Sequence, residues 1–414
     1  MFSWNIPMLE VSIEQAHRYI LDVQGLRTNK PCKSVLDVAR RIHNIQIDTI
    51  SVVSRSHNIT TFNRFEKYKD GRIWDELKTG NLFEFWSHSI CLMPIETYPY
   101  YKWIADSCAR RTRGWPVEWG VNNSQIVEDV YKHVKENGPT ASRDMGSNQS
   151  KREGWWDWKV EKHALEYLFT TGRLMVAFRE RFQKYYDLTE RVLPPSVSSE
   201  PLSDEEAAEF AAMVCIKSLG LASWQDVKFY TGTTVYRNLW GSTKKLQIYL
   251  ESLVDAGLLD QVSILGMQET YYVPFSRVSK LQTFRPISEP SPMKFLCPFD
   301  NLIRERHLPS KLWSFDYKIE AYTRPHERKY GYFVLPILHG AMFVGRMDAK
   351  VHREKSKFEV KALFLESEDW SDDDTLSAFK IGLDTFMKFH DCEEATIGAV
   401  TPKKMTSRVR ELYD

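Results

Sequence analysis

The sequence predicts an α+β protein with tandem winged-helix units followed by a C-terminal antiparallel β-barrel-like domain. Two observations carry this prediction. A succession of helix, short helix, helix and β-hairpin occurs twice in the middle of the chain, which is the element order of a winged helix. The last third is instead rich in strand-like runs. We expect four domains, over residues 1–120, 121–195, 200–280 and 285–414, and proline clusters mark the linkers between the last three of them.

The N-terminal region reads as helical. Helices are predicted over residues 12–25 and 34–45, where Ser12 and Ser34 are suitable N-caps because a serine hydroxyl can accept a hydrogen bond from a free backbone N–H of the first turn. A third helix is predicted over residues 49–56. We expect these elements to form a further helical or winged-helix-like unit.

The first winged helix begins with a helix over residues 124–137, which stops at Gly138-Pro139. A second long amphipathic helix is predicted over residues 155–171. Strand-like residues 174–178 and 182–188 follow it and predict the hairpin, or wing.

The second winged helix repeats this order. Helices are predicted over residues 204–219, 223–231 and 241–256, and the last of them ends at a glycine, which relieves a left-handed helix exit. Residues 258–265 and 269–275 then predict a second wing.

The C-terminal region is predicted to be a small barrel or sheet. Its strand-like runs cover residues 314–322, 332–338, 341–351 and 357–366. His339-Gly340 is a two-residue turn signal between two of these runs. A helix over residues 373–389 is expected to close the domain.

The composition is that of a folded globular chain. Hydrophobic residues make up 43% and charged residues 27% of the 414, which excludes a disordered protein. The 56 Lys and Arg residues nearly balance the 55 Asp and Glu residues, and the net charge of +1 excludes a polycation without excluding a local basic surface. No apolar run reaches the roughly 18 residues of a membrane span, and the first ten residues lack the basic segment and cleavage site of a secretion signal.

No cofactor or metal is expected. The six cysteines are scattered without a C-x-x-C pair, which is typical of reduced thiols and not of a zinc site. The eleven histidines form no H-E-x-x-H motif, and the chain has no phosphate-binding loop of the G-x-x-x-x-G-K-[ST] type.

Basic residues gather on the predicted wings and hairpins, where they suit contacts with nucleic-acid phosphates. A solvated surface is the alternative interpretation of each cluster. The DNA-binding candidates from these clusters and from the motifs below are Arg55, His88, Arg179, Arg181, Lys184, Arg346 and Lys350.

Gln46-Ile47-Asp48 is the candidate catalytic tripeptide. An amide and a carboxylate two residues apart lie on one face of an extended backbone, where they could hold and activate a water molecule. Asp48 could instead cap the helix predicted over residues 49–56, with Gln46 at the surface. Spacing alone leaves both interpretations open.

Two further segments carry aromatic residues. Residues 83–94 could be a packed strand in which a backbone group satisfies His88. The tryptophan-rich run over residues 154–159 could anchor a core or stack on bases.

Several long motifs, IQIDTISVVSRS, EFWSHSICLMP, GWWDWK, CPFDNLIRERHL and YGYFVLPILHGAMFVGRMDAK, together resemble the bacterial crosslink-repair DNA glycosylases of the YcaQ/AlkZ type. The resemblance covers about residues 9–390. It implies removal of N7-alkylated purines, unhooking of interstrand crosslinks, and a catalytic Gln-Φ-Asp tripeptide, here Gln46 and Asp48. Cys297 replaces the serine of the family's usual SPFD run, which we expect to be a packing change.

The resemblance also implies the partner. We expect double-stranded DNA with alkylated or crosslinked purines as substrate, no membrane association, a monomer, and a cytoplasmic, nucleoid-associated location. Because no lysine is placed by the motif as a Schiff-base nucleophile, we expect a monofunctional glycosylase. A non-enzymatic winged-helix transcription regulator is the alternative function, and a structural adaptor that uses the β-rich domain is a third.

Overall fold

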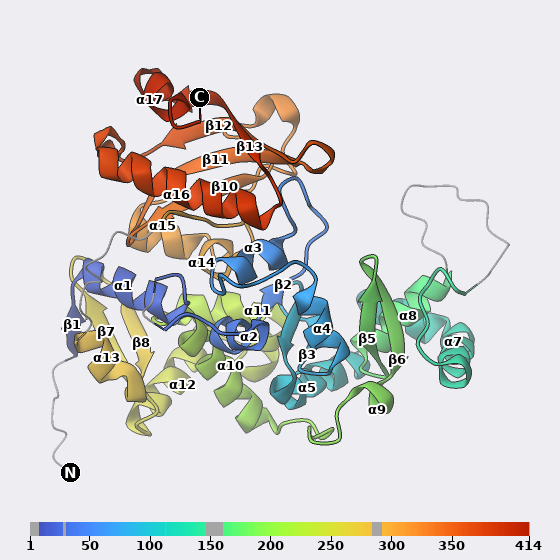
Figure 1. Ribbon diagram of the computed structural model, residues 1–414. Helices are drawn as coiled ribbons and strands as arrows, with labels where there is room; N and C mark the ends of the chain where they lie inside the picture. Colours follow the sequence, from blue (N-terminus) through green and yellow to red (C-terminus); the bar gives the residue numbers. More distant parts are fainter. Residues whose placement is uncertain (1–7, 28–29, 112, 146–159, 284–291, 414) are drawn as a thin grey trace, which may run out of the picture. The chain divides into compact units, whose positions relative to one another are not determined.

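The structure is a computed structural model that describes residues 8–27, 30–111, 113–145, 160–283 and 292–413. The chain divides into two compact units (Figure 1). The first comprises residues 1–69 and 212–414, and the second is the intervening segment 70–211. The tryptophan-rich run over residues 154–159 lies outside the described residues.

The N-terminal helices of the first unit form where serine caps predict them. Ser12 caps α1 (Ile13–Val23) by accepting a hydrogen bond from the N–H of Gln15, whose side chain accepts one from the Ser12 N–H in return. Ser34 caps α2 (Val35–Ile42) by accepting a hydrogen bond from the N–H of Asp37. Both predicted caps are confirmed, because capping depends only on neighbouring residues.

The helix predicted over residues 49–56 is wrong. The chain instead forms the short strand β2 (Ile45–Gln46), runs on without regular structure, and enters α3 (Ser56–Phe62) later. Backbone groups of this irregular stretch are held by residues far along the chain: the N–H of Val351 donates to the carbonyl oxygen of Val52, 3.0 Å away. These tertiary contacts override the helix propensity of residues 49–56.

The second predicted winged-helix region has the expected element order. Three helices are followed by a hairpin that gains a third, parallel strand from the N-terminus, β1 (Leu9–Val11). Gly232 interrupts the middle helix with a left-handed backbone (φ +77°), which places its break where the sequence predicts an end. The elements are α10 (Asp204–Leu219), α11 (Trp224–Leu239), α12 (Thr243–Asp255), β7 (Leu259–Ile264) and β8 (Thr270–Pro274).

The C-terminal region is a five-stranded mixed sheet with the order β13-β12-β11-β10-β9, and the predicted antiparallel barrel is corrected accordingly. In the described residues its outer strands β13 and β9 pair with one neighbour each. β12 and β13 run parallel, because the long helix α16 (Asp373–Phe389) crosses the sheet between them. The strands are β9 (Lys294–Phe295), β10 (Val334–His339), β11 (Met342–His352), β12 (Lys357–Leu365) and β13 (Glu394–Thr401).

The C-terminal sheet, α16 and α3 share one hydrophobic core. Figure 1 shows α16 lying across one face of the sheet, where Phe379 and Phe386 are fully buried together with Phe295 of β9 and Phe358 of β12. Ile59 of α3 belongs to the same core. The remaining helices of this unit are α13 (Val278–Gln282), α14 (Asn301–Arg304), α15 (His307–Trp313) and α17 (Thr406–Arg410).

The second unit combines two hairpins with helices. The predicted wing forms between β5 (Leu174–Glu180) and β6 (Gln183–Leu188). A second hairpin pairs β3 (Leu82–Trp86) with β4 (Ile90–Pro94), where the sequence predicted a single packed strand. The helices are α4 (Arg72–Lys78), α5 (Tyr98–Ala109), α6 (Val117–Asn122), α7 (Ser124–Asn137), α8 (Val160–Thr170) and α9 (Thr189–Val192). Among the described residues of both units, no helix has the length and apolar character needed to cross a membrane.

Candidate active site

The Gln46–Asp48 segment lies in the first unit, between α2 and α3. Gln46 belongs to β2 and is 8% exposed, whereas Asp48 follows the strand and is half-buried. One carboxylate oxygen of Asp48 accepts a hydrogen bond from the N–H of Ile50, 2.7 Å away. This contact closes a tight turn, and no helix begins at Asp48, so the helix-capping interpretation is wrong.

Polar side chains fix the start of this segment. The Asn301 side-chain amide donates to the carbonyl oxygen of Ile42, 2.7 Å away. The Ser56 hydroxyl donates to the carbonyl oxygen of Gln46 at the same distance. The backbone around Gln46 is therefore set before any substrate arrives.

The end of the segment is fixed by the C-terminal sheet. The guanidinium of Arg353 donates to the carbonyl oxygen of Val53, 2.6 Å away, beside the contact between Val351 and Val52. Ile50 and Val52 pack against the core of the sheet. Supports on both sides of Asp48 suit a catalytic group, whose position must be held to a fraction of an ångström.

A fully buried ion pair supports α3 from below. Arg64 binds both carboxylate oxygens of Asp300 at 2.6 and 2.9 Å, and its Nε donates to the carbonyl oxygen of Gln24. Cys297 lies nearby, with its sulfur 3.2 Å from the Thr60 hydroxyl, and burial raises the pKa of its thiol to about 12. The thiol is thus a neutral packing group, in agreement with the expected packing change.

Burial raises the pKa of Asp48 above its ordinary value, and the hydrogen bond from Ile50 only partly offsets this effect. A carboxylate with a raised pKa is a stronger base than an exposed one. His43, three residues before Gln46, is a weak base, because burial and the charge of Arg304 lower its pKa to about 3.

Tyr322 is a candidate that sequence reasoning missed. Its side chain is 81% exposed, and its pKa is raised by partial burial and by the negative charge of Asp48, which places the phenol within electrostatic reach of that carboxylate. Glu320 anchors the following loop by accepting hydrogen bonds from the N–H groups of Lys329, Tyr330 and Gly331. The interleaving of aromatic and basic residues in AYTRPHERKY was the available signal.

The predicted DNA-binding residues of the second unit fall into two groups. Arg179 binds both carboxylate oxygens of the buried Glu84 at 2.6 and 2.7 Å, and Lys184 lies 3.5 Å from the same group. Burial alone would raise the pKa of Glu84, but these two cations and their hydrogen bonds lower it. Arg181 instead lies exposed at the tip of the β5–β6 hairpin, and His88 lies exposed in the β3–β4 turn.

The predicted DNA-binding residues of the first unit divide similarly. Arg346 is 6% exposed, pairs with Glu366, and lies between the rings of Phe315 and Tyr330. Lys350 is exposed on β11, and Arg55 is half-buried at the start of α3. No group of three or more His, Cys, Asp or Glu side chains in the described part of the chain is arranged to hold a metal ion.

Comparison with known proteins places the chain among the DNA glycosylases. The family model described as DNA glycosylase AlkZ-like matches residues 39–381, and the chain therefore belongs to this AlkZ-like family. The fold is similar to that of Streptomyces sahachiroi DNA glycosylase AlkZ, with a TM-score of 0.63 and 14% sequence identity. That match covers 95% of this chain and 100% of the Streptomyces protein.

Proposed function

We propose that this protein is a monofunctional DNA glycosylase that hydrolyses the N-glycosidic bond of N7-alkylated purines and unhooks interstrand crosslinks. Family membership supports the glycosylase activity. The observation that carries the mechanism is the half-buried carboxylate of Asp48, which follows Gln46 by two residues on a backbone held by hydrogen bonds.

The reaction needs a base more than an acid. Alkylation at N7 makes the purine cationic, so when the C1′–N9 bond breaks, its electron pair neutralises the base and no added proton is required. Water must then form a bond to C1′ and lose a proton. Asp48 accepts that proton, and its negative charge stabilises the positive charge that develops on the sugar. Gln46 holds the water through its side-chain amide.

The finer architecture is part of the proposal. Residues 121–195 and 200–280 act as winged helices, and residues 1–120 and 285–414 complete the four modules. The exposed cations Arg181 and Lys350 contact phosphates, whereas Arg179, Lys184 and Arg346 have internal carboxylate partners and support the fold.

Excision assays test the proposal. Purified protein is incubated with a duplex that carries N7-methylguanine and with one that carries a nitrogen-mustard crosslink, and released base and unhooked strands are measured. We expect both products, without strand cleavage until alkali is added. Absence of base release from either duplex, together with tight binding of one undamaged sequence, would favour the transcription regulator instead.

A further inference from the structure

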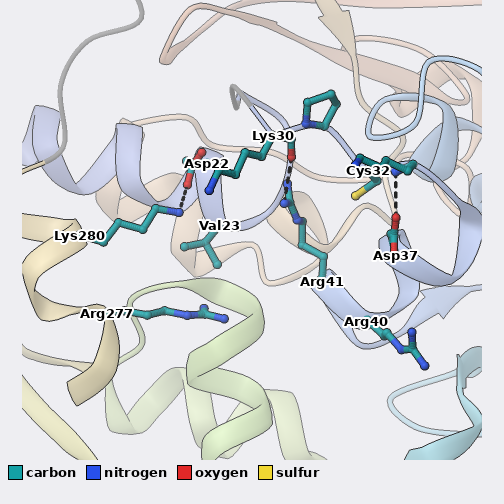
Figure 2. A pocket seen from close by; sticks show the side chains of 11 residues that line it. Asp22, Val23, Lys30, Cys32, Asp37, Arg40, Arg41, Arg277 and Lys280 are labelled. Carbon is teal, nitrogen blue, oxygen red and sulfur yellow. Dashed lines mark hydrogen bonds and ion pairs between the residues drawn. The ribbon is translucent and has the colours of Figure 1, made fainter.

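A basic cavity of about 410 Å³ opens where the end of α1, the segment 30–33, α2 and α13 approach one another (Figure 2). All of its lining residues belong to the first unit, and none belongs to the Gln46–Asp48 segment. Six of them are cationic: Lys30, Lys33, Arg40, Arg41, Arg277 and Lys280.

The charges of the cavity do not balance. Only two carboxylates, Asp22 and Asp37, line it together with the six cations, which leaves an excess of four positive charges. Both acids already have partners: Asp22 pairs with Lys280, and Asp37 accepts a hydrogen bond from the backbone N–H of Lys33 at 3.0 Å. Cations held this close repel one another, and an anion in the cavity would relieve that repulsion.

Backbone carbonyl oxygens hold two guanidinium groups of the cavity in place. Arg41 donates to the carbonyl oxygen of Lys30 at 3.0 Å, and Arg277 donates to that of Lys217 at 2.8 Å. In Figure 2, Arg277 and Lys280 reach in from the left, Arg41 lies to the right, and the side chain of Lys30 extends toward Asp22. A backbone carbonyl fixes the plane of a guanidinium but leaves its full charge for a ligand.

Gly25 provides the space for Arg41. It has a left-handed backbone (φ +73°), and a Cβ there would lie 2.9 Å from both Cδ and Nη1 of Arg41. The turn after α1 is thus shaped around the arginine side chain.

We propose that this cavity binds a phosphate group. Phosphate carries enough negative charge to balance much of the excess, and the planar fork of an arginine matches its oxygens better than it matches a monoatomic anion. The group could belong to the DNA backbone or to a free phosphate compound. Only the first source rests on the proposed function.

The test uses two full-length double variants with equal changes of charge. Lys33→Glu/Arg40→Glu removes the charge excess of the cavity through two exposed positions. Lys403→Glu/Lys404→Glu makes the same change at exposed positions that do not line the cavity. Thermal unfolding is followed during titration with inorganic phosphate at constant ionic strength, and binding of an undamaged duplex is measured at several salt concentrations.

Phosphate should raise the melting temperature of the wild type and of the control variant, but not of the cavity variant. If DNA is the source, the salt dependence of duplex binding should become less steep in the cavity variant, by about one to two phosphate contacts relative to the control. If phosphate no longer raises the melting temperature of the cavity variant, but its duplex binding depends on salt as in the control, the site binds a free phosphate compound. The proposal would be overturned if phosphate raised the melting temperatures of both variants equally. It would also be overturned if phosphate left the wild-type melting temperature unchanged and the salt dependence of duplex binding were the same in both variants.

The outcome is separable from the proposed glycosylase activity. Excision of N7-methylguanine is measured with the wild type, in parallel with the phosphate titration. Failure of the wild type to excise would contradict the proposed function and leave the phosphate titration unaffected.

Discussion

At the scale of single residues, the proposed chemistry depends on how Asp48 is placed. Its carboxylate is half-buried and has a raised pKa. It accepts a hydrogen bond from the N–H of Ile50. The sequence motif and the family resemblance identify this residue together with Gln46. Spacing could not decide between catalysis and helix capping, because the contacts that hold the segment come from Asn301, Val351 and Arg353.

We predict that Asp48→Asn lowers single-turnover excision of N7-methylguanine by roughly 10²- to 10⁴-fold, the usual contribution of a positioned base. Asparagine keeps the oxygen that accepts the Ile50 hydrogen bond, and it removes a charge that burial disfavours. The melting temperature should therefore stay constant or rise slightly. Excision at a rate close to wild type would exclude Asp48 as the base.

The pH dependence of excision should follow from the same group. A protonated carboxyl cannot accept a proton from water, so the rate should fall as the pH is lowered through the pKa of Asp48. Because burial raises that pKa, the fall should occur at a higher pH than for an exposed aspartate. Single-turnover rates over a pH series, corrected for release of base without protein, measure this. A midpoint at or below the ordinary aspartate value would contradict the assignment.

Tyr322 is expected to support the substrate rather than the fold. Its ring is exposed, and partial burial and the negative charge of Asp48 raise its pKa, so we expect the ring to stack on a base of the substrate. We predict that Tyr322→Ala lowers excision at limiting protein by about 5- to 100-fold, the worth of one stacked base. Tyr322→Phe keeps the ring and should retain most of the activity. An equal loss in both variants would point to the hydroxyl instead of stacking.

At the scale of secondary structure, the sequence predictions succeed where the element depends on neighbouring residues and fail where it depends on distant ones. Ser12, Ser34 and the helix over residues 373–389 are read correctly because caps and helical periodicity are local. The predicted strand over residues 314–322 is wrong in an instructive way. Phe315, Tyr317 and Ile319 are buried in alternation, as in a strand, yet this segment joins no sheet among the described residues. An alternating pattern of apolar residues predicts which side chains are buried, but a β-strand also needs a neighbouring strand with which to form hydrogen bonds.

The β5–β6 hairpin allows a test of two arginines that lie two positions apart. Removing Arg179 leaves Glu84 buried with weaker compensation, so Arg179→Ala should lower the free energy of unfolding by about 3–5 kcal/mol. Arg181→Ala, at the exposed tip, should change it by less than about 0.5 kcal/mol. Chemical denaturation measures both.

Duplex affinity then separates the two roles of the hairpin arginines. Folded Arg179→Ala protein should bind undamaged DNA like the wild type, whereas Arg181→Ala should bind more weakly. A stable Arg179→Ala protein with weakened DNA binding would return Arg179 to the DNA-contact group.

At the scale of the whole molecule, a net charge close to zero is compatible with local clusters of like charge. The net charge is +1, yet the cavity beside α2 alone has an excess of four positive charges. The family is evident from motifs spread along most of the chain, and the order of helices in the second predicted winged-helix region is predicted correctly. The division into two units and the mixed C-terminal sheet could not be predicted, because both depend on pairings between distant segments.

We predict binding to undamaged duplex that depends strongly on salt and little on sequence. Contacts to phosphates release counterions, so affinity should fall by roughly a hundredfold or more between about 50 and 200 mM salt. Fluorescence anisotropy with several unrelated duplexes measures this. A tight preference for one duplex that persists at high salt would support the regulator.

The supports of the Gln46–Asp48 segment also set an order of events during synthesis. The residues that hold it, from Asn301 to Arg353, follow it by some 250 to 300 positions in the chain. A nascent chain that displays Gln46 and Asp48 outside the ribosome soon contains Ser56, but it lacks the supports from Asn301, Val351 and Arg353 until the C-terminal sheet emerges. Truncated translation products would carry the tripeptide without its geometry. If Gln46 and Asp48 act as proposed, the site therefore gains its full set of supports only after the C-terminal sheet has been synthesised.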